Sequence, residues 1–291
     1  MPTLGDIKRL VIIADDELVG VPLQALPWGD GLLLDRFDVS YAPSLTTYAR
    51  WQGQSGRRAF SKDLLAIGAV GGRTPAASVA PPPTEDPIVA GTLYAASHPL
   101  PFARKEIAHI AALFPKDRAT AWVGDAATKS NLRRASKNGD LLQYRYVHFA
   151  THAWALPDQP ESSAIALAAS VADLPAESAL TAAELAGLRM DSDLIVLSAC
   201  DTGVGHFEHG RGLLGLAYAS LAAGNRAALL SLWPVADDTT AAFMELLYAN
   251  LRGGMSPPTA LAEVQRRFRH SPNPRLSDPL VWAPFVVYGA Y

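Results

Sequence analysis

The sequence contains a single cysteine among its 291 residues. One thiol cannot form a disulfide within the chain, and it fits a reducing compartment such as the cytoplasm, where we expect the protein to act. No stretch approaches the roughly 20 consecutive apolar residues that a membrane-spanning helix needs. The N-terminus does not read as a signal peptide, because its apolar run ends at Ala14 and Asp15, Asp16 and Glu17 follow at once. These features disfavour a membrane partner.

Charge of neither sign dominates the sequence. Its 25 Lys and Arg residues are balanced by 28 Asp and Glu residues, for a net charge of −3, so the composition gives no indication of a nucleic-acid partner. The chain is 49% hydrophobic. A domain of about 300 residues buries roughly 75% of its unfolded surface, so neither a disulfide nor a metal is required for stability.

Short apolar runs alternate with amphipathic segments along the chain, which predicts an α/β fold with a mostly parallel sheet and helices on both faces. Thr181 and Glu184 form a capping box, and Pro257 opens a helix behind Ser256. A Pro-, Ala- and Gly-rich stretch predicts a loop at 71–87. Strands are expected at 9–15, 38–44, 63–70, 119–124, 146–153, 164–170, 193–199, 227–233 and 282–290, and helices at 103–114, 128–136, 212–224 and 239–251.

Two of these strands end in reactive residues. The strand at 146–153 ends with His152, and the strand at 193–199 leads directly into Cys200. Sites in open α/β sheets form beyond the carboxyl ends of the strands, so neighbouring parallel strands would bring imidazole and thiol to one rim. A thiol with a pKa near 8.5 is little ionised at neutral pH. A nearby histidine raises the thiolate fraction and can later protonate a leaving amine.

Structural explanations compete with this one. A lone cysteine such as Cys200 is usually a small buried hydrophobe, and His152 alone would be an ordinary strand-end histidine. His148 lies inside its strand, which favours a structural role. His206 and His209 have HxxH spacing, but no clear third ligand accompanies them, so no metal site is expected. A serine hydrolase is disfavoured because the G-x-S-x-G motif is absent from the sequence.

Four motifs stand out in the second half of the chain: VHFATHA at 147–153, LIVLSACDTGVG at 194–205, SLWPV at 231–235 and DPLVWAPFVVYG at 278–289. Together they resemble the CHAT domain family, the bacterial caspase- and separase-like cysteine peptidases that are often joined to tetratricopeptide (TPR) repeats. The resemblance covers nearly the whole chain and is strongest over 144–291. His152 precedes Cys200 by 48 residues (200 − 152), close to the roughly 50 that separate the two residues in caspases.

The resemblance implies a caspase-like fold, with a pseudo-caspase half at 1–140 beside a catalytic half at 141–291. It also implies a cysteine endopeptidase that cleaves protein substrates without a metal or an organic cofactor. Cys200 would attack the scissile carbonyl and His152 would act as general acid and base. The backbone N–H groups of Ala153 and Cys200 would form the oxyanion hole, although the family usually has glycine where this chain has Ala153.

The resemblance further implies a TPR or other regulatory region, or a partner chain, and it leaves open a catalytically silent interaction module with the same fold.

Two aspartates follow the SLWPV motif, and a helix has a single N-cap, so one carboxylate would remain free near the rim. Separases, which prefer arginine before the cut, carry a similar W-x-V-x-D stretch whose aspartate matches Asp237. Asp237 is therefore expected to select a basic residue, with a helix-start role as the alternative. Asp201 could line the substrate pocket or simply stabilise its turn.

Overall fold

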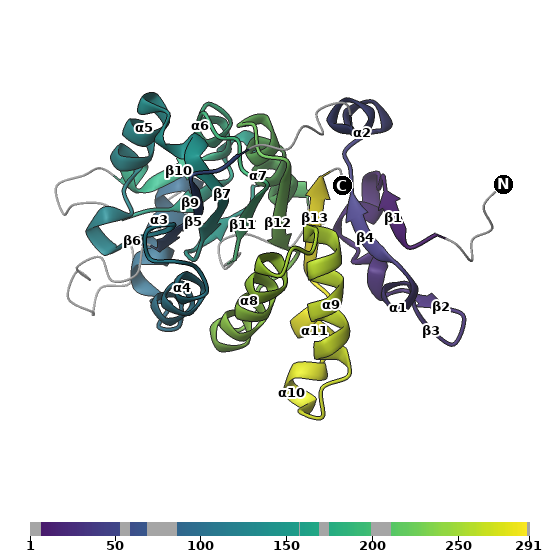
Figure 1. The fold of residues 1–291 in the computed structure, drawn as a ribbon. Helices are drawn as coiled ribbons and strands as arrows, with labels where there is room; N and C mark the ends of the chain where they lie inside the picture. Colours follow the sequence, from purple (N-terminus) through teal and green to yellow (C-terminus); the bar gives the residue numbers. More distant parts are fainter. Residues whose placement is uncertain are drawn as a thin grey trace.

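The computed structural model describes residues 7–52, 59–68, 86–156, 158–168, 175–198 and 211–289. Among these residues, the central element is an eight-stranded sheet with the order β1-β4-β13-β12-β11-β7-β5-β6 (Figure 1). Its strands are β1 (Arg9–Ile12), β4 (Asp38–Tyr41), β5 (Lys62–Gly68), β6 (Ala119–Val123), β7 (Tyr144–Phe149), β11 (Leu194–Leu197), β12 (Ala227–Ser231) and β13 (Phe285–Gly289).

The sheet consists of two parallel blocks. Strands β6, β5, β7, β11 and β12 run in one direction, and β13, β4 and β1 run in the other, with the reversal between β12 and β13. The mostly parallel sheet predicted from the sequence is therefore confirmed. Strands from before residue 140 occupy both edges of the sheet and later strands occupy its middle. The division into two halves at residue 140 stays a prediction.

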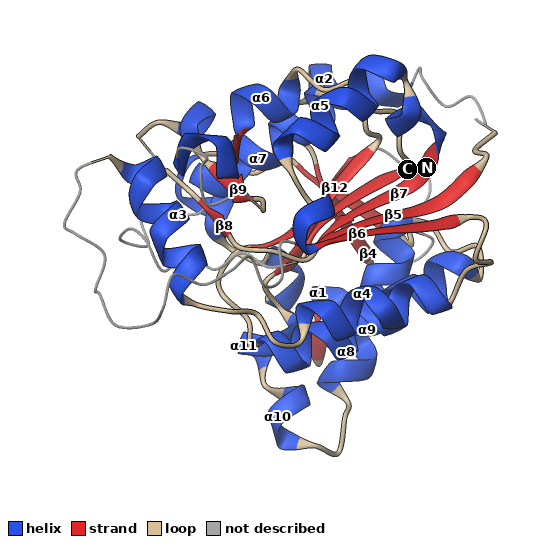
Figure 2. Cartoon of the chain, turned by 90° about the vertical axis from the view of Figure 1, so that its left-hand side faces the viewer, coloured by secondary structure: helices blue, strands red, loops and turns tan. Residues whose placement is uncertain are grey.

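Helices cover both faces of the sheet (Figure 2). One face carries α4 (Ala103–Ala112), α8 (Asp237–Arg252) and α9 (Pro257–Arg269), and the other carries α5 (Lys129–Asn138), α6 (Ala182–Ala186) and α7 (Arg211–Ala222). The central strands read as continuous apolar runs because both of their faces are buried. The remaining α-helices of the described residues are α1 (Leu33–Arg36), α2 (Leu45–Gln52), α3 (Pro87–Ser97), α10 (Pro274–Ser277) and α11 (Pro279–Trp282).

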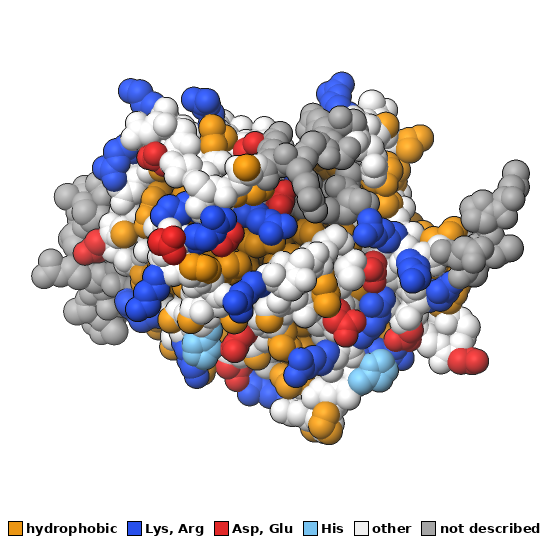
Figure 3. All heavy atoms as spheres, viewed as in Figure 1, with side chains coloured by type: hydrophobic (Ala, Val, Ile, Leu, Met, Phe, Trp, Pro, Cys, Tyr) orange, Lys and Arg blue, Asp and Glu red, His pale blue; other side chains and the backbone are white. Residues whose placement is uncertain are grey.

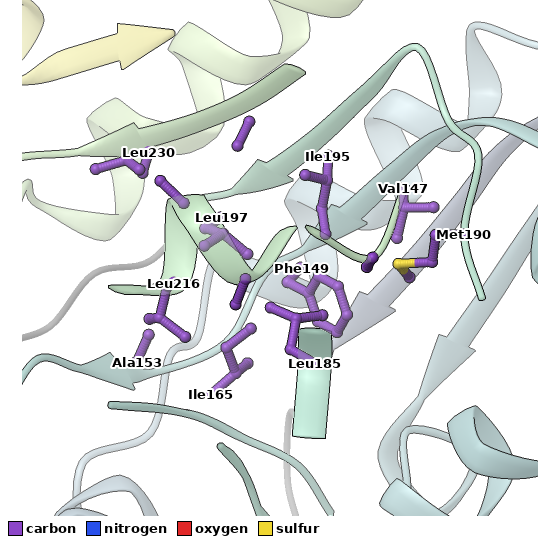
Figure 4. Close-up of a cluster of buried hydrophobic side chains, with 14 of the residues drawn as sticks. Val147, Phe149, Ala153, Ile165, Leu185, Met190, Ile195, Leu197, Leu216 and Leu230 are labelled. Carbon is purple, nitrogen blue, oxygen red and sulfur yellow. The ribbon is translucent and has the colours of Figure 1, made fainter. Parts of the chain in front are cut away.

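Successive side chains of each strand enter opposite cores. Val147 and Phe149 of β7 pack with Ile195 and Leu197 of β11 in the cluster drawn in Figure 4. Tyr146, one position away, packs in the second core against α4 and α8. This alternation decides which helices the side chains at the ends of β7 and β11 face.

A second, small antiparallel sheet lies beside the first, with the order β10-β9-β8. Its strands are β8 (Ala153–Trp154), β9 (Ala164–Ala166) and β10 (Ala179–Thr181), and a two-stranded hairpin is formed by β2 (Pro27–Trp28) and β3 (Gly31–Leu32). The strand predicted at 146–153 is thus divided, because β7 ends at Phe149 and β8 begins at Ala153. The chain turns between Phe149 and Ala153, and His152 lies in this turn.

Local signals in the sequence predicted several element ends correctly. Thr128 caps α5 by accepting a hydrogen bond from the Asn131 N–H, and Thr181 forms its capping box with Glu184. The strand predicted from 282 begins only at Phe285, because Asp278 and Pro279 start the short helix α11 first. Most of the predicted 71–87 loop, residues 71–85, lies outside the described residues, and α3 was not predicted.

Charged side chains of both signs are interspersed across the face shown in Figure 3, as the balanced composition predicts. Within the described parts of the chain, no helix combines the length and the apolar character that crossing a bilayer would require.

Helix α3 packs against the small sheet through Gly91. A Cβ atom added there would lie 2.4 Å from two carbon atoms of the Trp154 indole. Gly91→Ala should therefore lower the free energy of unfolding by about 1–3 kcal/mol through overpacking. This loss should outweigh the roughly 1 kcal/mol that alanine gains over glycine from helix propensity. The measurement is the urea midpoint, with Ala96→Ser at an exposed position of the same helix as the control. A midpoint equal to or above that of the parent would contradict the packing argument.

Candidate active site

Strands β7 and β11 are parallel neighbours, as the predicted site requires. Their register pairs Val196 with His148 and Leu197 with Phe149. One step further along, the Ser198 N–H donates to the Phe149 carbonyl oxygen at 2.9 Å. Cys200, the predicted nucleophile, follows Ser198 by two residues and lies outside the described residues, as does Asp201. The described part of the site therefore consists of the histidine and the groups around it.

His152 is held in place at the turn between the two sheets. The Ala166 N–H donates to the His152 carbonyl oxygen at 2.8 Å, and the Thr151 hydroxyl donates to the Ala166 carbonyl oxygen at 2.8 Å. The imidazole Nε2 pairs with the carbonyl oxygen of His98, directly after α3. A carbonyl only accepts, so Nε2 carries a proton, and Nδ1 is the ring nitrogen that can accept one.

Aromatic rings complete the surroundings of His152. The Tyr94 ring lies edge-on to the imidazole, with 5.8 Å between ring centroids, and stacks on the His98 ring at 3.9 Å. The His152 side chain is 5% exposed. Its orientation is therefore fixed from the side of α3, which no sequence pattern predicted.

His148 has the structural position that its place inside the strand predicted. Its side chain is 0% exposed, and Nε2 lies 2.8 Å from Oε1 of Glu106 on α4. Sequence analysis missed Glu106, since a charged residue in a helix is normally solvated. The available signal was its helical spacing, because Glu106 lies on the apolar side of α4 with Ala103 and Ile110.

Ala153 begins β8 and pairs with Ile165 in an antiparallel ladder. The preceding pair, His152 and Ala166, is hydrogen-bonded through the Ala166 N–H. Hydrogen-bonded and non-hydrogen-bonded pairs alternate along an antiparallel ladder, so the Ala153 N–H points away from β9. Strand residues have negative φ, so the replacement of the family's glycine by alanine causes no backbone strain.

The two aspartates at the start of α8 have different surroundings, and neither is the N-cap. That position belongs to Ala236, and both aspartates lie in the first turn of the helix. The expectation that one of the two carboxylates remains at the tip of the loop before the helix is therefore wrong. Asp238 forms a bidentate ion pair with Arg275, with both N–O distances at 2.8 Å. Oδ2 of Asp237 instead accepts the Phe102 N–H at 2.6 Å.

Asp237 is electrostatically connected to the histidine. Burial raises the pKa of the Asp237 carboxyl, and the negative charges of Glu106 and Asp238 act in the same direction. The Phe102 N–H and the His152 imidazole oppose this rise. The structure therefore brings Asp237 within electrostatic range of His152, although the two lie 85 residues apart (237 − 152).

Metal ligation is not indicated within the described ranges, which contain no group of three or more His, Cys, Asp or Glu side chains arranged to hold an ion. His206 and His209, the HxxH pair of the sequence, lie outside those ranges.

Comparisons with known proteins agree with the motifs. The model of the CHAT domain family matches residues 2–290. Tetratricopeptide repeat protein 28 of mouse is 27% identical over 322 residues, and its human counterpart is 26% identical over 319 residues. Each match covers 99% of this chain and 12% of the relative, so the chain spans about one-eighth of the length of these proteins. Both relatives are mammalian, so the likeness is not restricted to bacteria.

A solved structure shows the same fold. The Saccharomyces cerevisiae separase–securin complex, determined at 3.0 Å resolution, contains a chain that aligns with a TM-score of 0.53 at 12% sequence identity. The alignment covers 89% of this chain and 14% of the other. The architecture is therefore the caspase-like α/β fold found in separase, with a mostly parallel sheet between two helical layers.

Proposed function

Because the chain belongs to the CHAT domain family, we propose that it is a cysteine endopeptidase in which Cys200 is the nucleophile and His152 the general base and acid. The observation that carries this proposal is the register of β7 and β11. Val196 pairs with His148, an offset of 48 residues (196 − 148), which equals the offset between Cys200 and His152. His152 and Cys200 each follow the last pair of this register by three residues (152 − 149 and 200 − 197), which supports a meeting of imidazole and thiol at the same end of the two strands.

The tautomer of His152 defines the proton transfers. With Nε2–H held by the His98 carbonyl, Nδ1 takes the proton from the Cys200 thiol, and the thiolate attacks the scissile carbonyl carbon. The N–H groups of Ala153 and Cys200 hold the resulting oxyanion. His152 then gives the proton to the leaving amine as the C–N bond breaks, and water hydrolyses the acyl-enzyme. A reducing compartment such as the cytoplasm keeps this thiol free.

We also propose that Asp237 selects a basic residue before the cut and that Asp201 lines the same pocket. The support for Asp237 is its electrostatic interaction with His152, in contrast to Asp238, which is bound to Arg275. A guanidinium group can bind such a carboxylate through two hydrogen bonds.

The test is a peptide-library digest that compares the parent protein with Cys200→Ala, followed by labelling with a peptidyl electrophile that reacts with thiols. Cleavage that disappears in Cys200→Ala supports the proposal. An unreactive Cys200 and an undigested library would instead favour a catalytically silent interaction module.

Ala153→Gly should not increase activity. Since Ala153 is already extended and 1% exposed, glycine removes a buried methyl group and adds chain entropy to the unfolded state. We expect a loss of about 0.5–1 kcal/mol from chain entropy alone, measured from the urea midpoint, and an unchanged kcat. A marked rise in kcat would show that the turn needs a glycine conformation.

A further inference from the structure

Beneath the proposed dyad, one side-chain oxygen links both strands that lead to it. Glu106 of α4 is 2% exposed. Its Oε1 atom accepts a hydrogen bond from the Ser198 hydroxyl at 2.5 Å and lies 2.8 Å from His148 Nε2, so the same atom joins the two residues. His148 comes four residues before His152, and Ser198 comes two residues before Cys200.

We propose that Glu106 is a positioning residue that sets the separation of His152 and Cys200 by binding the ends of β7 and β11 through one atom. This inference rests on the proposed function, because it assumes that the two residues act together. Glu106 itself touches neither reacting group. It acts through His148 and Ser198.

The side chains add a second link to the one that the sheet already provides. Backbone pairing between the two strands is described as far as the hydrogen bond from the Ser198 N–H to Phe149. The side chains of His148 and Ser198 leave the sheet on the side of α4, where Glu106 closes a bridge between them. The His148 ring is also packed edge-on against Tyr248, with 5.4 Å between centroids, so its position is fixed from two directions.

Stability does not account for a carboxylate in this place. The contact from the Ser198 hydroxyl lies at the short end of the range for O–H···O hydrogen bonds. Burying a carboxylate is costly, and an apolar side chain of similar size is often as stabilising or more so. Its negative charge also acts on Tyr248, where burial and then Glu106 raise the pKa of the phenol. The arrangement is therefore explained better by what it holds in place.

The experiment uses the single cysteine as its reporter, because iodoacetamide then alkylates only Cys200. The rate of Cys200 alkylation is measured as a function of pH for the parent protein, Glu106→Ala, Glu106→Gln and Ser198→Ala. For the same proteins, kcat and KM are measured on a peptide that the parent cleaves. Asn225→Ala serves as the matched control. The Asn225 side chain is also buried, and it binds the backbone of Ser192, which precedes β11, and of Ser220 on α7, at the end of the sheet opposite the rim.

In Glu106→Ala, we expect kcat to fall by about 10²-fold with a nearly unchanged KM, since a displacement of about 1 Å can cost that much. The alkylation midpoint should rise toward the value of about 8.5 of a free thiol, because the imidazole no longer lies beside it. Glu106→Gln should keep kcat and the alkylation midpoint close to those of the parent, because its amide oxygen can accept the same two hydrogen bonds. Ser198→Ala, which removes one bond with little change of volume, should lie between the parent and Glu106→Ala.

Each other result overturns the inference. If Glu106→Ala and Asn225→Ala lose activity equally, Glu106 contributes only stability. If Glu106→Gln is as inactive as Glu106→Ala, charge and not the shared oxygen matters. If Glu106→Ala does not fold, the test rests on Ser198→Ala. An unchanged kcat and an unchanged alkylation midpoint in Ser198→Ala would contradict the proposal. A parent midpoint near 8.5 that His152→Ala does not change would refute the dyad as well, which distinguishes failure of the proposed function from failure of this inference alone.

Discussion

His152→Ala should abolish peptide cleavage while the fold stays intact. General acid–base groups contribute about 10²–10⁴ in rate, and here the same imidazole also generates the thiolate. We expect a loss of at least that size in kcat/KM, measured on the best peptide from the library digest. The urea midpoint should change little, because the strands that flank His152 are held by backbone hydrogen bonds.

His148→Ala should instead cause mainly a large loss of stability, with a smaller loss of activity than His152→Ala because it removes only one of the two links to Glu106. It leaves the buried Glu106 carboxylate without its imidazole partner, and breaking a buried pair typically costs about 3–5 kcal/mol. The exposed His109, which is paired with Glu245, provides a neutral control, and His109→Ala should change neither quantity appreciably. An active His152→Ala beside an inactive, well-folded His148→Ala would show that the wrong histidine was assigned.

Asp237→Asn should remove the preference for arginine before the cut. A charged hydrogen bond contributes about 1.5–3 kcal/mol, so selectivity between matched Arg and Leu peptides should fall roughly 10- to 100-fold. Asparagine can still accept the Phe102 N–H, which separates the charge from the local hydrogen bond. Asp238→Ala, which breaks the pair with Arg275 and the hydrogen bond from the Thr239 N–H, should keep the selectivity and lose about 1 kcal/mol of stability. Unchanged Arg/Leu selectivity in Asp237→Asn would rule out the role of Asp237.

The raised pKa of Asp237 adds a pH dependence to this result. A carboxyl with a raised pKa is charged above that value and gains its proton as the pH falls through it. Arginine selectivity should therefore be present at neutral pH and begin to decline at a higher pH than an ordinary aspartate would allow. The same sign means that ionising Asp237 reduces folding stability above its pKa, so Asp237→Asn should be at least as stable as the parent at neutral pH.

The strands that carry the site could be predicted because their signals are local. The runs that end near His152 and Cys200 are mostly apolar, and parallel strands joined by helices have few alternative arrangements. The capping of α5 by Thr128 depends on residues three positions apart. In each case the determinant is contained in a short stretch of sequence.

The parts that could not be predicted depend on contacts between distant segments. Glu106 lies 42 residues before His148, and nothing in α4 alone shows that its carboxylate faces a histidine. The orientation of His152 depends on the carbonyl of His98, a backbone group that has no sequence signature. Asp237 and Asp238 are adjacent and chemically identical, and only their tertiary neighbours Phe102 and Arg275 distinguish them.

The reversal of the sheet between β12 and β13 has a consequence for how the chain acquires its structure during synthesis. Strands β1 and β4 join the rest of the sheet through β13, and residues 42–284 lie between β4 and β13. At the roughly 5–20 residues per second of translation, those 243 residues (284 − 41) take about 12–50 s to be made. Until β13 has been made, β4 has no strand to pair with on the side that faces the middle of the sheet. Completion of this end of the sheet is thus a late, long-range event, whereas β5, β6 and β7 can pair soon after they are made.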